Sequence, residues 1–125
     1  MRLSVNPNDK TPIYRQLYDQ IAAEVLSGLL KPGEPLPPIR TVSRELGVSM
    51  ITVRSAWDAL ERDGFLVTRT GSGCFVAPIS EARRQSKVNE KLLGSIDETI
   101  SAAKSLGISG DELCQMIAER YHSQR

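Results

Sequence analysis

The chain has 125 residues, of which 25% are charged and 40% hydrophobic, and its formal net charge at pH 7 is +1. That size suits one small domain, or one domain with an appendage. No apolar run approaches twenty residues, and the polar N-terminus lacks the features of a signal peptide, so we expect neither a membrane span nor secretion.

Two cysteines forty residues apart and a single histidine, His122, offer no disulfide framework and no ligand set for zinc. We therefore expect no metal and no cofactor, and a reducing cytoplasm as the location. Both Cys74 and Cys114 are interpreted as small hydrophobic residues, and a redox role for either is left open.

The charges are spread evenly along the chain. Up to Ile79 there are nine Lys and Arg against eight Asp and Glu, and from Ser80 on there are seven of each. Neither half is a basic tail. Affinity for nucleic acid must therefore come from the placement of a few arginine side chains at the interface, and from the presence of two such interfaces in a dimer.

The first predicted helix begins at Thr11-Pro12, with Thr11 as its N-cap, and ends at Gly28. Its apolar residues recur about every four positions and predict one buried stripe: Ile13, Leu17, Ile21, Val25 and Leu26. Residues 29–38 contain four prolines and one glycine, so we expect a stiff connector that is neither a helix nor a central strand.

Two short helices are predicted next, at Ile39–Leu46 and Ser49–Asp63, with Gly47 in the turn and Ser49 as N-cap. Each carries one apolar stripe, and we assign to the core Val42, Leu46, Val53, Trp57 and Leu60. Two helices joined by so short a glycine-containing turn indicate a helix-turn-helix, whose second helix enters the major groove of DNA.

A β-hairpin follows this motif. Phe65–Val67 and Cys74–Ala77 are short apolar segments on either side of a glycine-containing tip at residues 68–73. A hairpin directly after a recognition helix is typical of a wing. The alternative is a hairpin that only covers the core.

The C-terminal third predicts two helices. The first runs over residues 80–106 and stops at Gly107, and the second follows the capping-box pattern Ser109-Gly-Asp-Glu112. Together they would form a helical hairpin, and two hairpins from two copies would close a small bundle. We expect the contacts between the copies to be made by Val88, Leu92, Ile96, Ile100, Leu113, Ile117 and Tyr121.

The predicted fold is therefore mainly α with a small β-hairpin. Residues 1–79 would form an N-terminal winged helix-turn-helix domain that binds DNA, and residues 80–125 a C-terminal antiparallel helical hairpin for dimerisation.

Several segments taken together resemble the GntR family of bacterial transcriptional regulators. The resemblance covers about 66 of 125 residues, from Pro12 to Ala77, and is carried by Pro32–Arg40, Leu46–Ser49, Thr52–Arg54, Leu60–Leu66 and Gly71–Val76. The remaining 48 residues are too few for a large effector-binding domain. A tail of two helices resembles the YtrA subfamily, in which a short helical hairpin serves dimerisation.

The resemblance implies DNA contacts at specific positions. Arg40 corresponds to the first arginine of the family's helix-turn-helix, and the family's Ser/Thr-Arg-x-Thr-Val-Arg corresponds to Ser49–Arg54. Ser49 and Thr52 keep hydroxyls that can reach phosphate, and Arg54 keeps a guanidinium that can engage guanine or phosphate. Met50 replaces the family's arginine, so the family's base preference should not be carried over. Partial core burial of Met50 and Ile51 is the alternative.

The tip of the hairpin completes the expected interface with Arg69, Thr70, Gly71, Ser72 and Gly73, whose glycines allow the backbone to approach a groove. For Arg44 and Lys31, exposure to solvent without a DNA contact is favoured.

The sequence thus predicts a homodimeric repressor on a palindromic operator, and the subfamily resemblance adds control of transporter genes. A small-molecule effector of unknown identity, bound where the wing domain meets the helical hairpin, is our hypothesis for how the regulator is switched. The alternative is a winged-helix module that binds a protein partner without contacting DNA. No nucleophile with a base, no catalytic carboxylate pair and no phosphate-binding loop is recognisable, so we do not expect an enzyme.

Overall fold

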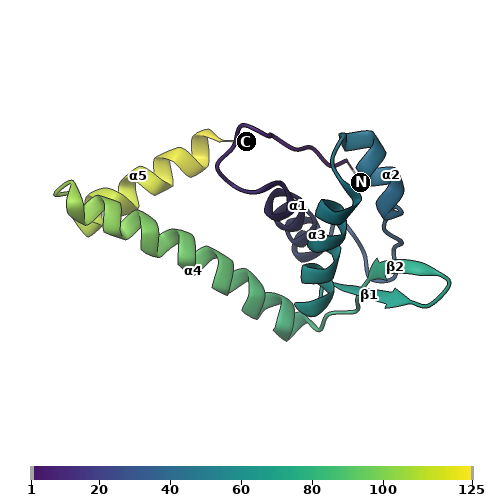
Figure 1. The fold of residues 1–125 in the computed structure, drawn as a ribbon. Helices are drawn as coiled ribbons and strands as arrows, with labels where there is room; N and C mark the ends of the chain where they lie inside the picture. Colours follow the sequence, from purple (N-terminus) through teal and green to yellow (C-terminus); the bar gives the residue numbers. More distant parts are fainter. Residues whose placement is uncertain (1, 125) are drawn as a thin grey trace. The chain divides into compact units, whose positions relative to one another are not determined.

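The computed structural model describes residues 2–124, and within them the chain is mainly helical with one two-stranded antiparallel sheet (Figure 1). The elements in chain order are α1 (Ile13–Ser27), α2 (Ile39–Leu46), α3 (Met50–Arg62), β1 (Leu66–Arg69), β2 (Gly73–Val76), α4 (Glu81–Ser105) and α5 (Gly110–Ser123). The predicted fold class is confirmed. Among the described residues, no helix is both long and apolar enough to span a bilayer.

The contacts within the chain divide it into two compact units, one extending to Arg84 and the other beginning at Gln85. The first contains α1, α2, α3, the hairpin and the first turn of α4. The second contains the rest of α4 and α5.

The core of the first unit forms where α1 packs against α3, with α2 and β1 also packed on α3 (Figure 1). Leu17, Ile21, Val53 and Leu60 have no exposed surface, and Trp57 is 4% exposed, so the predicted core assignments on α1 and α3 are confirmed. The buried stripe of α1 also contains Tyr18 and Ala22, while Ile13 is half-buried at its edge.

Proline precedes the first residue of α1 and of α2, and glycine follows the last residue of each. Gly28 and Gly47 end α1 and α2 with φ values of 83° and 68°, in the left-handed region that favours glycine. The predicted cap at Thr11 is wrong, because α1 begins at Ile13 with Pro12 as its N-cap and without a side-chain capping bond. Thr11 instead uses its carbonyl, which accepts a hydrogen bond from Gln16 Nε2 at 2.8 Å.

The proline-rich connector is bonded to the hairpin. Leu36 N–H donates to the carbonyl of Cys74 at 2.8 Å, and Val76 N–H donates to the carbonyl of Glu34 at 2.8 Å. An isolated antiparallel bridge joins Pro35 to Phe75 between these bonds. The connector is neither helix nor central strand, as predicted, and it lies along β2.

The strands of the hairpin differ from the prediction by one or two residues. Leu66 pairs with Val76 at the base and Arg69 with Gly73 at the far end. The loop is therefore shorter than the predicted tip of residues 68–73 and consists of residues 70–72, closed by a hydrogen bond from Ser72 N–H to the carbonyl of Arg69 at 2.9 Å. Arg69 and Gly73 are the last and first residues of their strands.

In the second unit, α5 returns antiparallel to α4 (Figure 1). The predicted capping box is confirmed, since Glu112 N–H donates to Ser109 Oγ at 3.2 Å and Ser109 N–H donates to Glu112 Oε1 at 3.3 Å. From residue 85 to residue 124, Ala103 is the one buried residue.

Candidate nucleic-acid interface

The N-terminus of α3 carries a network of two hydroxyl groups. Ser49 Oγ accepts a hydrogen bond from Thr52 N–H at 3.0 Å and lies 2.8 Å from Thr52 Oγ1. One hydroxyl proton is used between the two side chains, so the other can be donated outward. The positive end of the helix dipole lies at the same place, and such an end favours an anion such as phosphate.

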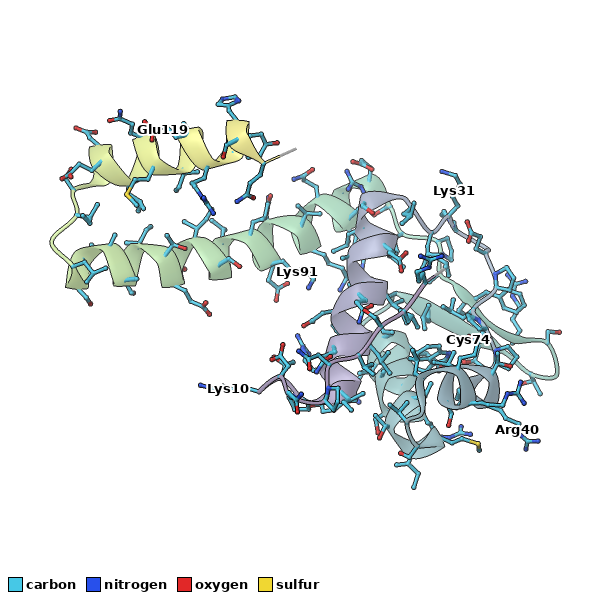
Figure 2. The ribbon with its side chains drawn as sticks, turned by 90° about the horizontal axis from the view of Figure 1, so that it is seen from above. Lys10, Lys31, Arg40, Cys74, Lys91 and Glu119 are labelled. Atoms are coloured by element: carbon cyan, nitrogen blue, oxygen red, sulfur yellow. The ribbon has the colours of Figure 1, made fainter. Side chains whose placement is uncertain are left out.

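Two arginines of the helix-turn-helix have no salt-bridge partner in the described part of the chain. Arg40 is the second residue of α2 and Arg54 the fifth of α3, and both are exposed. Among residues 2–124 neither guanidinium forms a salt bridge, in contrast to Arg15, which pairs with Asp19 at 3.3 Å. Figure 2 shows Arg40 directed away from the helices. Both guanidinium groups are therefore available to a phosphate or a guanine edge.

The first two residues of α3 have large apolar side chains that are exposed to solvent. Met50 is 43% exposed and Ile51 is 78% exposed, so the alternative of partial core burial fails for Ile51 and is weak for Met50. Exposed apolar groups at the start of a recognition helix can contact a thymine methyl group in the major groove.

The hairpin is held to α3 and presents its loop to solvent. The hydroxyl of Thr68 donates to a carboxylate oxygen of Glu61 on α3. The guanidinium of Arg69 lies 4.9 Å from the centroid of the Phe75 ring, a cation–π contact that orients it at the base of the loop. Residues 70–73 are exposed, as a wing requires.

Cys74 begins the return of the hairpin toward the core and is half-buried, whereas Cys114 on α5 is exposed. Burial raises the pKa of the Cys74 thiol, so the neutral form is favoured there. The residues described here contain no group of three or more His, Cys, Asp or Glu side chains arranged to hold a metal ion.

Two further contacts fix the first unit, and the sequence did not reveal them. Tyr18 on α1 donates its phenol proton to Asp63 at the C-cap of α3. At the start of α4, Arg84 Nη1 donates to the carbonyl of Leu26 at 2.6 Å and Nη2 pairs with Glu81 at 2.9 Å. The bond with Arg84 lowers the pKa of Glu81. These partners are up to 58 residues apart, and no local pattern indicates them.

The weaker basic candidates, Lys31 and Arg44, are both exposed. Lys31 Nζ lies 3.4 Å from the carbonyl of Gly28, which it can reach as a donor. Arg44 is exposed in the last turn of α2, on the far end of that helix from Arg40.

The apolar residues expected at a dimer contact lie mostly on the surface of the second unit. Leu92, Ile96, Ile117 and Tyr121 are 56%, 44%, 50% and 77% exposed. A shallow groove of about 340 Å³ is lined by Thr99, Leu113, Met116, Ile117, Arg120, Tyr121 and Gln124. Val88 and Leu113 are half-buried and Ile100 is 37% exposed.

Comparison with known proteins places this geometry in a family. Residues 13–76 match the family described as bacterial regulatory proteins, gntR family. The HTH-type transcriptional repressor YtrA of Bacillus subtilis is 30% identical over 120 residues, covering 94% of this chain and 90% of YtrA. The pyridoxine biosynthesis regulator PdxR of Corynebacterium glutamicum is 38% identical over 89 residues, covering 71% of this chain but 20% of PdxR. The chain thus spans nearly the whole of YtrA but only a fifth or less of PdxR and of the rhizopine catabolism regulator MocR of Rhizobium meliloti.

Solved structures agree with the fold. A transcriptional antiterminator from Listeria monocytogenes EGD-e superposes with a TM-score of 0.76 at 28% identity, covering 97% of this chain and 90% of that one. The DNA-binding domain of AraR, solved in complex with operator ORX1, gives a TM-score of 0.52 at 30% identity, covering 60% of this chain and 93% of that one. The chain therefore belongs to the GntR family, is similar to YtrA over most of its length, and is a winged-helix DNA-binding transcriptional regulator.

Proposed function

We propose that this regulator is a repressor that binds a palindromic operator as a homodimer. The observation that carries the proposal is the pair of exposed guanidinium groups of Arg40 and Arg54, which form no salt bridge with any of residues 2–124 and lie early in α2 and α3 inside the family-matched segment. The hydroxyl pair of Ser49 and Thr52 would donate its one free proton to a phosphate beside them.

The remaining contacts would give position and sequence preference. Met50 and Ile51 would meet thymine methyl groups, while Arg69 and residues 70–73 would track the backbone at the neighbouring groove. A net charge of +1 leaves little general attraction for DNA. Two heads on one duplex would double the few available phosphate contacts, which is why we propose a dimer as the binding species.

The dimer would form through the second unit. Large side chains such as Leu92, Ile96 and Ile117 are exposed there, and contiguous apolar surface on a protein marks an interaction site. A second copy of the same hairpin offers the matching surface, because a two-fold interface uses one patch twice. In this proposal residues 1–79 bind DNA and residues 80–125 bind the other copy.

The regulated genes are proposed from the relatives. YtrA carries the name of a transcriptional repressor and matches 94% of this chain, which supports repression. From the subfamily resemblance we propose genes for transporters as targets and a cytoplasmic location.

Selection of duplexes from a randomised library by the pure protein tests the proposal. We expect the native chain to enrich a palindrome, with less enrichment at higher salt. Arg54→Ala should weaken binding by roughly 1–3 kcal/mol if the side chain makes a bidentate base contact. Arg62→Ala is the matched control, since Arg62 is exposed at the opposite end of the same helix and should leave affinity unchanged.

A folded native protein that enriches no sequence even at low salt would contradict the proposal. It would favour the protein-interaction alternative instead.

A further inference from the structure

Residues 3–6, which precede α1, are tied to that helix by two half-buried glutamine side chains. Gln20 Oε1 accepts a hydrogen bond from Ser4 N–H at 3.1 Å, and Gln20 Nε2 donates to the Ser4 carbonyl at 2.6 Å. Gln16 bonds Asn6 in the same way, at 2.8 Å and 2.9 Å. Residues 3–6 therefore form an N-terminal strap that α1 holds at two points, each through both backbone polar groups of one residue.

The spacing of the two glutamines matches the spacing of the strap residues. Gln16 and Gln20 are four residues apart on a helix, which is about 6 Å along its axis. Residues two apart in an extended chain are separated by about 6.6 Å, and their N–H and C=O groups point to the same edge. A side-chain amide offers one acceptor and two donors, so each glutamine can bind the N–H and the C=O of one such residue.

Further hydrogen bonds fix the two amides and the turn that leads into α1. Gln16 Nε2 also donates to the carbonyl of Thr11 at 2.8 Å, and Gln20 Nε2 donates to the carbonyl of Gln16 at 3.0 Å. Asp9 N–H donates to the carbonyl of Asn6 at 3.1 Å, where the chain reverses. The strap is thus an ordered part of the first unit.

At its far end the strap lies against α2. Leu3 is half-buried, and it lines a small void of about 40 Å³ together with Pro37, Val42, Glu45 and Leu46. Figure 1 shows the N-terminal end of the chain beside α2. Val42 is the one buried residue of α2, and Leu46 is half-buried, so Leu3 adds apolar cover on the side of α2 that carries these two residues.

α2 depends on such packing for its position. It has eight residues, fewer than an isolated helix needs to be stable in water. It packs on α3, and Leu3 of the strap supplies a further apolar contact. With about 3.6 residues per turn, Arg40 lies on the opposite side of α2 from Val42, so a shift of α2 at the Leu3 contact also moves Arg40.

We propose that Gln16, Gln20 and Leu3 are positioning residues for DNA binding. The two glutamines hold the strap, Leu3 of the strap holds α2, and α2 places Arg40 against the DNA backbone. The strap lies outside residues 13–76, which match the family. Its hold on α2 rests on contacts within the chain, whereas its effect on affinity rests on the proposed function.

Amide hydrogen exchange of the free, full-length protein tests the strap without DNA. The N–H groups of Ser4 and Asn6 are hydrogen-bonded, so their exchange should be slowed in the native chain. Gln16→Met combined with Gln20→Met keeps two long side chains on α1 but removes both amides. In this double variant the protection of Ser4 and Asn6 should be lost.

Affinity for the selected duplex shows whether the strap acts through Arg40. The double glutamine variant should bind roughly three- to tenfold more weakly than the native chain, as expected for the partial loss of a contact. In an Arg40→Ala background the further loss should be less than about twofold, the usual error of additive effects, because the positioned group is already absent. In an Arg69→Ala background the full loss should remain.

Salt dependence separates positioning from a merely structural role. Loss of folded protein lowers the apparent affinity without changing its salt dependence. Displacement of Arg40 should make the plot of log affinity against log salt shallower, toward the slope of Arg40→Ala.

Variants of Leu3 and a control on another helix sharpen the test. Leu3→Ser should reproduce the loss of affinity, whereas Leu3→Met, which keeps an apolar side chain, should bind as the native chain does. Gln115→Met is the matched control. It removes an exposed amide on α5 that bonds Glu119 at 3.3 Å, and it should leave affinity unchanged.

Ser4 and Asn6 amides that exchange as fast in the native chain as in the double variant would overturn the strap. An equal loss of affinity in the native and Arg40→Ala backgrounds, or no loss in the native one, would overturn the positioning of Arg40. A native protein that binds no duplex would overturn the proposed function and with it the effect on DNA. Amide exchange would still decide on the strap, because it is measured without DNA.

Discussion

Substitutions of Ser49 should separate an effect on the stability of the fold from an effect on affinity for DNA. Its hydroxyl caps α3 by accepting the Thr52 N–H at 3.0 Å, and it shares with the Thr52 hydroxyl the one free proton that is proposed to be donated to phosphate. Removal of the hydroxyl in Ser49→Ala should therefore cost stability and affinity together. Replacement by aspartate should divide the two effects, because aspartate caps a helix as well as serine does but repels phosphate.

The expected magnitudes follow from these contacts. Loss of the N-cap in Ser49→Ala should lower the free energy of unfolding by about 1 kcal/mol, which corresponds to a fall in Tm of roughly 4–8 °C for a domain of this size. The exposed bond to the Thr52 hydroxyl adds little. Loss of one hydrogen bond from a hydroxyl to the charged phosphate should weaken each half-site by roughly 10- to 150-fold. Ser49→Asp should keep the native Tm and lose about a hundredfold or more in affinity, since like-charge contact costs several kcal/mol.

Thermal unfolding followed by circular dichroism gives the first quantity, and fluorescence anisotropy with the duplex recovered by selection gives the second. Ser109→Ala is the matched control, because it removes a similar cap from α5 and touches no proposed DNA contact. The reasoning is refuted if Ser49→Asp binds DNA as tightly as the native chain. A native Tm for Ser49→Ala would refute the capping argument.

Two other predictions concern the interface between copies and the core. Ile117→Asp should convert the dimer to a folded monomer in sedimentation, because a charge replaces a half-exposed apolar side chain of the proposed interface. Gln115→Asp on the same helix is the control and should remain dimeric. A dimeric Ile117→Asp would exclude this face as the interface. Burial, and then the hydrogen bond to Asp63, raise the pKa of Tyr18, so its stabilising contribution is complete below about pH 10 and is lost as the pH rises through the higher folded value. The tyrosinate absorbance of native protein minus that of Tyr18→Phe should accordingly appear only at pH values well above 10, and its appearance near pH 10 would show that the phenol is not held.

Most of the helical framework could be predicted because local chemistry determines it. Proline and glycine mark where helices start and stop, and α2 has the predicted bounds of Ile39–Leu46. Regular spacing identified Val53 and Leu60 as core, because a helix buries one stripe. Thr11 was wrongly assigned as the N-cap because proline was placed at the first helical position. In the structure Pro12 is itself the N-cap and the helix begins at Ile13.

What the sequence could not give depends on contacts between distant residues. The hydrogen bonds from the connector to Cys74 and Val76 join segments about forty residues apart. They place the connector beside α3, where the two line a pocket with Trp57. The spacing of apolar residues assigned Trp57 to the core, correctly, but could not show that its indole N–H is left without an acceptor. The exposure of Ile51 likewise depends on which face of α3 meets α1.

The salt dependence of binding to the selected duplex, measured with the number of chains per duplex, tests the central claim most directly. Two heads that each place Arg40 and Arg69 on phosphates, with Arg54 on a base, would neutralise four charges, so a plot of log affinity against log salt should have a slope of roughly −4, with two chains bound to one palindrome. A slope near zero, or one chain per duplex with an unchanged slope, would contradict a dimeric regulator that reads its operator through these arginines.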